Sequence, residues 1–239
     1  MINLGKIARA VAIAAVIPLA AVGIWTTASN AEGLLPVAAP APAIDEPAAS
    51  GTETAVFAGG CFWGVQGVFQ HVKGVKSALA GYSGGHVDNP SYELVGTETT
   101  GHAEAVRVEF DPKVVSYGKL LQIFFSVVTD PTTLDYQGND YGTSYRSALF
   151  TMNDAQAKVA TAYIAQLDAA KIYPGKVVTE VTPYTNFFQA EDYHQDNAYT
   201  MKVNPSYLNA FDEPKIADMK AHFADFWMDK PVLVFASNA

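Results

Sequence analysis

The order of predicted helices and strands indicates an α/β protein: a two-layer, ferredoxin-like α/β sandwich followed by a long C-terminal coil. From residue 52 onward, hydrophobic periodicity gives the order β-α-β-β-α-β and then one more helix and strand, which suits this fold. Of the 239 residues, 49% are hydrophobic and 16% are charged, as is typical of globular proteins. Because no internal repeat or second linker interrupts the pattern, residues 52–228 are predicted to form one domain, with 229–239 as a tail.

The first half of this domain is predicted to contain three strands and one helix. The apolar run at 54–58 ends in two glycines and predicts a buried strand. Apolar residues then recur with i, i+3, i+4 spacing over 61–71, which predicts a helix with one face inward. Residues 75–82 end in Ser-Gly-Gly, and residues 103–110 alternate polar and apolar side chains, so both segments are predicted to be strands.

The second half continues with two longer helices. Residues 116–128 predict a helix with a strongly apolar face, and 146–151 predict a strand. Asn153 is a suitable N-cap for a helix that runs to Lys171, before Pro-Gly. A strand is expected at 176–182. The remainder is rich in Tyr, Asn, Asp and Pro and is expected to be coil with a short helix near 215–226; coil of such length is uncommon in a compact domain unless it is functional.

The first residues of the chain have the composition of a targeting segment. Within residues 1–31, a basic start precedes an apolar run at 10–25 and small residues at 28–31. This order is typical of a secretory signal peptide, with cleavage expected after Ala28 or Ala31. The run is short for a membrane span of about 20 residues, and an uncleaved N-terminal anchor in the inner membrane is the alternative. Both interpretations predict an exported, periplasmic protein.

Three further features of the composition bear on the organisation of the chain and on its function. Residues 32–51, dominated by Ala and Pro, are predicted to be a linker that buries no core. The net charge of −9 and the absence of a basic stripe argue against nucleic-acid binding. The single cysteine excludes internal disulfides and zinc sites built on cysteines.

That cysteine occupies a reactive position in the predicted fold. Cys61 follows a strand and two glycines and opens a helix, where free N–H groups and the helix dipole favour a negative charge. We therefore expect an accessible sulfur with a lowered thiol pKa. Phe62 and Trp63 follow directly and are candidates for the wall of an apolar pocket. The alternative is a buried, inert cysteine, the commoner state of a lone cysteine.

Polar residues that could support such a thiol are spread along the chain. Glu104 begins the strand at 103–110, where burial would raise its pKa and keep it protonated as an acid; alternatively it lies at an exposed strand end and pairs with a base. A polar loop with strong turn chemistry ends at Tyr145. His102 with Glu104, and residues 193–196, are the only places where potential metal ligands crowd together, and neither has a recognised metal-binding spacing. No metal site is predicted.

Eight segments together resemble the methionine sulfoxide reductase A family, in the family's order, between about residues 52 and 208. They are Gly60-Cys61-Phe62-Trp63-Gly64, Gly81-Tyr82-Ser83-Gly84-Gly85, Asn89-Pro90-Ser91-Tyr92, Gly101-His102-Ala103-Glu104-Ala105, Asp130-Pro131-Thr132-Thr133, Gly138-Asn139-Asp140, Tyr145-Arg146-Ser147 and Glu191-Asp192-Tyr193-His194-Gln195. One such segment would be weak; eight in order are highly specific.

The resemblance implies a function and a role for each matching residue. It implies reduction of the S epimer of peptide methionine sulfoxide, with Cys61 as the nucleophile that attacks the sulfoxide sulfur. Glu104 matches the acid that protonates the oxygen, and Tyr92 and Tyr145 match the tyrosines that hydrogen-bond it. Asp140 matches an aspartate near the polar side of the substrate. The aromatic pair after the cysteine matches the pocket for the substrate methyl group.

The absence of a second cysteine departs from many family members, which recycle through one. A sulfenic acid on Cys61 would therefore need an outside reductant: a thioredoxin-like or glutaredoxin-like protein or a small thiol, with no other cofactor. A monomer is expected. Two other functions are compatible with the same cysteine, a thiol peroxidase and a non-catalytic binder of oxidised methionine. The aromatic pair favours the reductase, since a peroxide needs no apolar cage.

Overall fold

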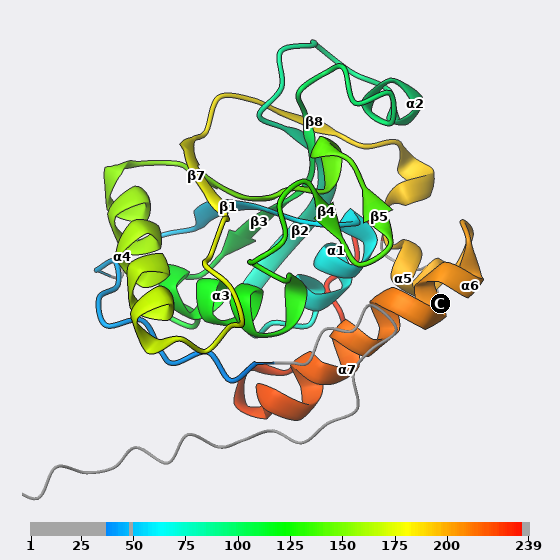
Figure 1. The fold of residues 1–239 in the computed structure, drawn as a ribbon. Helices are drawn as coiled ribbons and strands as arrows, with labels where there is room; N and C mark the ends of the chain where they lie inside the picture. Colours follow the sequence, from blue (N-terminus) through cyan, green and yellow to red (C-terminus); the bar gives the residue numbers. More distant parts are fainter. Residues whose placement is uncertain (1–36, 48–49, 236–239) are drawn as a thin grey trace, which may run out of the picture.

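The computed structural model of the chain describes residues 37–47 and 50–235, which form an α/β domain built on one six-stranded sheet (Figure 1). The strands follow the order β7-β6-β1-β3-β2-β8. All neighbours are antiparallel except β6 and β7, which are parallel. Their bounds are β1 (Glu53–Gly59), β2 (Val75–Ser83), β3 (Ala103–Phe110), β6 (Ser147–Thr151), β7 (Glu180–Pro183) and β8 (Phe187–Gln189).

The predicted β-α-β-β-α-β core is confirmed. The inner strands β6-β1-β3-β2 are the ferredoxin-like set, joined by α1 (Phe62–Gln70) and by α3 (Tyr117–Ile123). The helix expected at 116–128 begins at its cap Ser116, as predicted, but its second half is the π-helix η1 (Phe124–Val128). Asn153 caps α4 (Asp154–Ala170) through its side chain, again as predicted.

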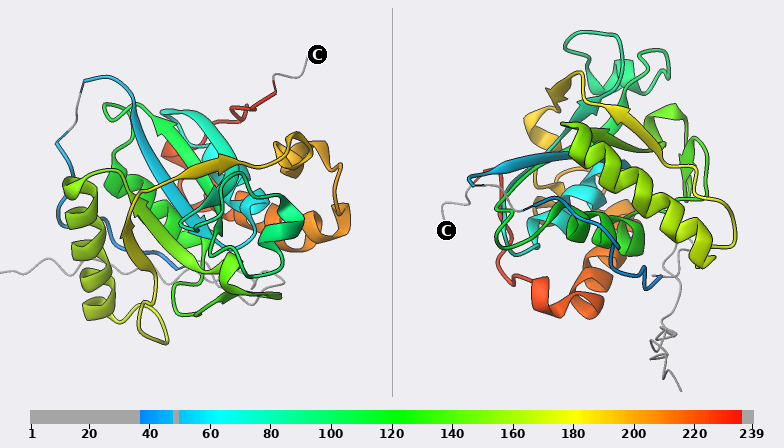
Figure 2. Two further views of the ribbon diagram at one scale, coloured as in Figure 1. Left: turned by 90° about the horizontal axis from the view of Figure 1, so that it is seen from above. Right: turned by 90° about the vertical axis from the view of Figure 1, so that its left-hand side faces the viewer.

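The hydrophobic core lies mainly on one face of the sheet. Phe57 of β1 stacks on Phe69 of α1 with ring centroids 4.7 Å apart and also meets Phe124. The opposite face has a smaller cluster, in which Val56 and Phe150 pack with Tyr184 and Phe187. Figure 2 shows α4 at one side of the molecule and the short C-terminal helices at the other.

The chain after β6 is more regular than its composition indicates. The strand expected at 176–182 is limited to β7, because Val178 donates to the carbonyl of Pro131 rather than to the sheet. The expected helix near 215–226 is present as α7 (Glu213–His222) and a 3-10 turn, η5 (Ala224–Phe226). The segment predicted to be coil also contains β8, the 3-10 turn η3 (Asp192–His194), α5 (Asn197–Thr200), α6 (Pro205–Tyr207) and the π-helix η4 (Leu208–Asp212).

Strand β8 depends on a glycine in its neighbour. A Cβ at Gly81 would lie 2.3 Å from the carbonyl oxygen of Phe188, so only glycine lets the two backbones approach. The resulting edge strand brings the following segment, including His194, back over the N-terminal end of α1. No local pattern in the sequence signals this pairing.

The linker predicted to bury nothing instead packs on the domain over residues 37–47. Ala39 is buried, and Val37 donates to the carbonyl of Ser126. Tyr163 of α4 donates to the carbonyl of Pro40, and Asp45 accepts from the backbone of Gly118 at 2.9 Å. A linker rich in Ala and Pro thus follows the surface of α3 and α4 through its backbone groups.

The last residues that the structure describes also lie against the domain, next to α1. The amide of Val232 donates to the carbonyl of Gln70 at the end of that helix. The amides of Val234 and Phe235 both donate to the buried carboxylate of Asp196. Residues 1–31, for which a signal peptide is predicted, lie outside the described residues. Within 37–47 and 50–235, no helix is long and apolar enough to cross a bilayer.

Candidate active site

Cys61 is held at the N-cap of α1 by the turn that leaves β1. Gly60 has a φ of 95°, a conformation that favours glycine, and a Cβ there would lie 2.8 Å from Cβ of Gln137. The backbone of Cys61 itself is non-helical, with φ −51° and ψ 121°, as expected at an N-cap. The residue is only 7% exposed, so the predicted accessible sulfur is wrong.

The environment of the thiol also reverses the expected pKa shift. Burial raises the pKa of Cys61 well above its ordinary value, and the charges of Asp212 and Glu104 raise it further. A hydrogen bond from the N–H of Trp63 acts in the opposite direction and is outweighed. The helix terminus favours the thiolate, as predicted. Burial and the nearby carboxylates outweigh it and determine the direction of the pKa shift, and only the fold reveals them.

Glu104 is buried beside this helix terminus. The side chain is 3% exposed, and its Oε2 accepts a 2.9 Å hydrogen bond from the backbone N–H of Phe62. Burial raises the pKa of Glu104 to about 8 even though this hydrogen bond lowers it. The prediction that Glu104 is buried is confirmed, and the alternative of an exposed glutamate paired with a base is wrong. Its role as an acid stays a prediction, which the raised pKa supports.

Tyr92 and Tyr145 come from two separate loops and meet at the site. Tyr92 begins the short helix α2 (Tyr92–Val95), and Tyr145 ends the 3-10 turn η2 (Thr143–Tyr145). The two phenols lie close enough for each to influence the pKa of the other. Burial, together with the charge of Glu104, raises the pKa of each phenol beyond its usual range, so both hydroxyls keep their protons at neutral pH.

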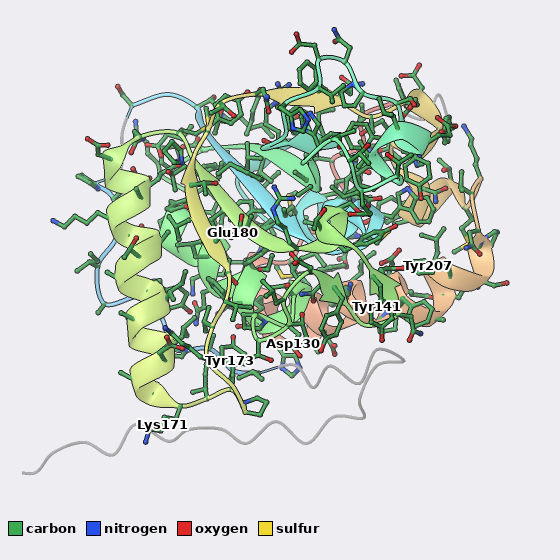
Figure 3. The ribbon with its side chains drawn as sticks, turned by 45° about the horizontal axis from the view of Figure 1, so that its top comes forward. Asp130, Tyr141, Lys171, Tyr173, Glu180 and Tyr207 are labelled. Carbon is green, nitrogen blue, oxygen red and sulfur yellow. The ribbon has the colours of Figure 1, made fainter. Side chains whose placement is uncertain are left out.

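Asp140 lies near the thiol, in the small hairpin of β4 (Tyr136–Gln137) and β5 (Asp140–Tyr141). Its carboxylate accepts a hydrogen bond from the hydroxyl of Tyr207 in α6. Figure 3 shows Tyr207 and Tyr141 on the same side of the molecule, from these two elements. Burial raises the pKa of Asp140, whereas Tyr207 and Lys215 lower it.

Aromatic rings enclose the space beside the thiol. Phe62 is fully buried, and its ring centroid lies 6.4 Å from that of Tyr92 in a stacked arrangement. Trp63 packs edge-on against Tyr207 at 5.9 Å. The indole Nε1 of Trp63 donates to Nδ1 of His194 at 3.1 Å, which fixes the direction in which this ring faces. Both residues of the aromatic pair are therefore buried among other rings next to Cys61, and their role as the wall of a pocket stays a prediction.

All seven residues singled out in the sequence are thus brought together, but the sequence did not identify their supports. Tyr207 and His194 complete the aromatic enclosure. Asp212 and Lys215, both fully or almost fully buried, lie against Gly64, one turn after the cysteine. His194 lies in one of the eight resembling segments, but no pattern in the sequence marks Tyr207, Asp212 or Lys215, because they reach the site through the C-terminal chain reversal. In the described part of the chain, no three His, Cys, Asp or Glu side chains are grouped as metal ligands.

Comparison with known proteins identifies the family of the chain. The family model described as peptide methionine sulfoxide reductase matches residues 53–226. The chain is 52% identical over 197 residues to the peptide methionine sulfoxide reductase MsrA 2 of Mesorhizobium japonicum, covering 82% of this chain and 100% of that protein. It is 48% identical over 176 residues to the MsrA of Pasteurella multocida, covering 74% and 99% of the two chains.

Two solved structures share the fold. Methionine sulfoxide reductase A of Corynebacterium diphtheriae has 35% sequence identity and a TM-score of 0.56, over 66% of this chain and 77% of that one. Reduced Mxr1 from Saccharomyces cerevisiae has 29% identity and a TM-score of 0.58, over 68% of this chain and 91% of that one. Both similarities cover the larger part of the chain.

Proposed function

Because the chain belongs to the peptide methionine sulfoxide reductase family and is an oxidoreductase with that activity, we propose that it reduces the S epimer of the sulfoxide at Cys61. The observation that carries this proposal is a buried, protonated carboxyl group, Glu104, beside the only sulfur nucleophile. Two protonated phenols and an aromatic enclosure complete the arrangement. Substrates would be oxidised methionine in proteins or the free amino acid.

The first step transfers the oxygen atom away from the substrate sulfur. The Cys61 thiolate attacks that sulfur while Glu104 donates its proton to the oxygen, on which negative charge accumulates. Hydrogen bonds from Tyr92 and Tyr145 stabilise the same charge. The hydroxyl of the resulting adduct then moves to the Cys61 sulfur, as the bond between the two sulfurs and the bond from the substrate sulfur to oxygen break. The products are methionine and a sulfenic acid on Cys61, so the substrate sulfur is reduced by two electrons and the cysteine sulfur is oxidised by two.

The aromatic residues would hold the substrate in the reactive orientation. The buried rings of Phe62 and Trp63 suit a small apolar group such as the methyl on the sulfoxide sulfur. Holding that group fixes the sulfur within reach of the thiolate. Asp140, whose carboxylate is fixed by Tyr207, would face the polar backbone of the substrate.

The raised pKa of Cys61 requires that binding itself favours the thiolate. In the free site, burial and neighbouring carboxylates disfavour a second negative charge. The sulfur of a sulfoxide carries partial positive charge because its bond to oxygen is polar. Placed next to Cys61, it would stabilise the thiolate when substrate is present. The nucleophile is then formed only in the complex.

An external thiol would regenerate the enzyme, because the chain has no second cysteine. A first thiolate attacks the sulfenic acid sulfur and releases water, which leaves a mixed disulfide with Cys61. A second thiol then displaces Cys61 as a free thiol and forms a disulfide with the first. A thioredoxin-like or glutaredoxin-like protein, or a small thiol, can supply both equivalents, and no further cofactor is needed.

The cellular setting is part of the same proposal. The basic, apolar and small residues at the start of the chain support export to the periplasm, where the protein would act as a monomer. Attachment to the inner membrane would follow only if that segment is not cleaved. The acidic charge of the chain gives no support to a nucleic-acid partner.

A turnover assay on separated sulfoxide epimers, with dithiothreitol as reductant, tests the proposal. The S epimer should be reduced, Cys61→Ser should abolish the activity, and Glu104→Gln should slow the single-turnover rate about 10²- to 10⁴-fold, the usual contribution of a general acid. Hydrogen peroxide serves as a competing substrate. Full activity of Cys61→Ser, or faster reaction with peroxide than with sulfoxide, would overturn the assignment.

A further inference from the structure

The loop before β3 contains a glutamate in an unusual backbone conformation. Glu98 has a φ of 63°, in the left-handed region that non-glycine residues rarely adopt. Such a conformation is strained for a residue with a Cβ and persists where other contacts hold it. The side chain of Glu98 provides these contacts.

The carboxylate of Glu98 binds the turn that carries Tyr145. One oxygen, Oε2, accepts from Oγ1 of Thr143 and from the backbone N–H of Ser144, each at 2.8 Å. The other, Oε1, accepts from Oγ of Ser144 at 2.6 Å. Ser144 is 2% exposed, whereas Glu98 is partly buried and Thr143 is exposed, so water is excluded only on the Ser144 side of this anchor. Both carboxylate oxygens are therefore occupied by two consecutive residues of η2.

The approach of this carboxylate requires the glycine before the turn. Gly142 has a φ of 139°, and a Cβ at that position would lie 2.4 Å from Oε1 of Glu98. The backbone of η2 is closed by a hydrogen bond from the N–H of Tyr145 to the carbonyl of Gly142. Glu98 thus fixes a turn in which the two residues immediately before Tyr145 are both held by one side chain.

The same short segment also supplies the other tyrosine of the site. Tyr92 begins α2, and the N–H of Glu98 donates to the carbonyl of Val95 at the end of that helix. The amide of Tyr92 is itself held by Oε1 of Glu191 at 2.9 Å. Residues 92–98 therefore position Tyr92 directly and Tyr145 through the carboxylate of Glu98.

We propose that Glu98 is a positioning residue for the reaction: its carboxylate holds η2 so that the hydroxyl of Tyr145 stays against that of Tyr92, where both reach the sulfoxide oxygen. This inference rests on the proposed function of the two tyrosines. Without the carboxylate, η2 keeps its own turn hydrogen bond but loses three bonds to the segment that contains Tyr92. Tyr145 then no longer has a fixed distance to Tyr92.

Glu98→Gly is the most direct test, because it removes the carboxylate and also relieves the left-handed strain, so the fold is not weakened by the backbone. The single-turnover rate with the S sulfoxide should fall about tenfold or more, as is typical when a reacting group is misplaced by about an ångström. Glu98→Gln keeps one acceptor and should show a smaller loss. Glu93→Gln, which removes an exposed carboxylate from the same segment, is the matched control and should not change the rate.

A double-mutant cycle separates positioning of Tyr145 from a general structural effect. In a Tyr145→Phe background, Glu98→Gly should cause little further loss, because the hydroxyl that it positions is absent. In a Trp63→Phe background, the loss should be as large as in the wild type. An equal loss in the Tyr145→Phe background, or unchanged activity of Glu98→Gly in an otherwise active enzyme, would overturn the proposal.

Hydrogen exchange provides a readout that does not depend on activity. The amide of Ser144 donates to Glu98, so it should exchange faster in Glu98→Gly, while amides of β3 stay protected. If the wild type fails to reduce sulfoxides, the proposed function fails whatever the exchange result. If the wild type is active and Ser144 exchanges equally in both proteins, the positioning role of Glu98 fails alone.

Discussion

The backbone N–H of Phe62 donates a 2.9 Å hydrogen bond to the carboxyl group of Glu104. The first free amide of the helix that begins after Cys61 therefore binds the acid, while the backbone of the next residue, Trp63, lowers the pKa of the thiol. One helix terminus thus sets the separation of nucleophile and acid. Because Glu104 is also 3% exposed, this single contact does not ionise it, and its pKa rises to about 8.

The raised pKa of Glu104 predicts a pH-dependent gain in stability for Glu104→Gln. In the unfolded chain a glutamate titrates near about 4.3, whereas in the folded protein the pKa is about 8. Between these values the folded state retains a proton that the unfolded state has lost, so wild-type stability falls as pH rises. The variant should be similar to wild type near pH 5 and more stable near pH 8, by on the order of a few kcal/mol.

Urea unfolding at several pH values measures this difference. Glu109→Gln, near the other end of the same strand, controls for the loss of one negative charge. A stability gain for Glu104→Gln that is the same at pH 5 and pH 8 would contradict a raised carboxyl pKa.

The burial of Cys61 predicts slow modification at neutral pH. A free cysteine titrates near about 8.5, and burial with the charges of Asp212 and Glu104 raises the pKa of this thiol well above its ordinary value. The rate of reaction with a small thiol reagent should therefore still be rising above pH 9. Asp212→Asn should move the curve to lower pH because it removes the strongest of the charge effects. A midpoint below 8 in the wild type would show instead that the helix terminus dominates.

The contact of Trp63 with His194 predicts an effect on substrate affinity. Nδ1 of His194 accepts the indole proton, so this imidazole is neutral with its own proton on Nε2. His194→Phe retains a ring but leaves the indole N–H without its acceptor. A buried donor without a partner costs about 1–3 kcal/mol. The Trp63 ring can avoid this cost by moving out of its position. KM for the sulfoxide should rise severalfold, with a smaller change in kcat.

The pH dependence of KM provides a second measurement of the same contact. Burial lowers the pKa of His194 below its usual value, so protonation, which converts Nδ1 into a donor, occurs only in more acidic solution. Wild-type KM should therefore increase in acidic solution, below the ordinary titration range of histidine, and that increase should be absent in His194→Phe. A pH-independent KM in both proteins would argue against this hydrogen bond.

Gly64 predicts a site where a better helix former destabilises the protein. Replacing glycine by alanine inside a helix usually gains up to about 1 kcal/mol. Here the new Cβ would lie 2.4 Å from Oδ1 of Asp212, which is fully buried and has little room to move. Overpacking of this kind costs about 1–3 kcal/mol, so Gly64→Ala should lower the free energy of unfolding.

Gly96 is the matched control for that substitution. Its backbone is right-handed, with φ −63°, and a Cβ there would meet nothing closer than 3.5 Å. Gly96→Ala should leave stability unchanged or slightly improved in the same thermal unfolding experiment. A Gly64→Ala protein as stable as this control would mean that Asp212 can shift without loss.

The core of the fold could be predicted because local periodicity determines it. Strands β1, β2, β3 and β6 and helices α1, α3 and α4 follow apolar spacing, and Asn153 caps its helix as its side chain suggests. The short elements between them, α2, β4, β5 and η2, were not predicted. Strand β8 could not be predicted, since it depends on a close approach to Gly81 that links distant parts of the chain. The packing of residues 37–47 uses backbone carbonyls and amides, which leave no hydrophobic pattern in the sequence.

The parts of the site formed by residues adjacent in the sequence could be predicted. The properties and residues that depend on tertiary contacts could not. Cys61 with its aromatic neighbours forms a local motif. The sign of its pKa shift was predicted wrongly, because the helix terminus is visible in the sequence and the burial is not. Tyr207 and Asp212 approach from the C-terminal segment and have no recognisable spacing from Cys61. The supports of the site, unlike the groups that react, are known only from the fold.

The packed stretch at residues 37–47 limits how far an anchored form of the protein could travel from a bilayer. If the apolar run at 10–25 stayed in the membrane, only residues 26–36 would separate it from the first residue fixed on the domain. Fully extended, residues 26–36 would span at most about 40 Å. If the linker were free up to residue 51, the greatest distance between the domain and the membrane would more than double. An anchored enzyme would therefore repair only proteins that pass close to the membrane surface, whereas a released one could reach the whole compartment.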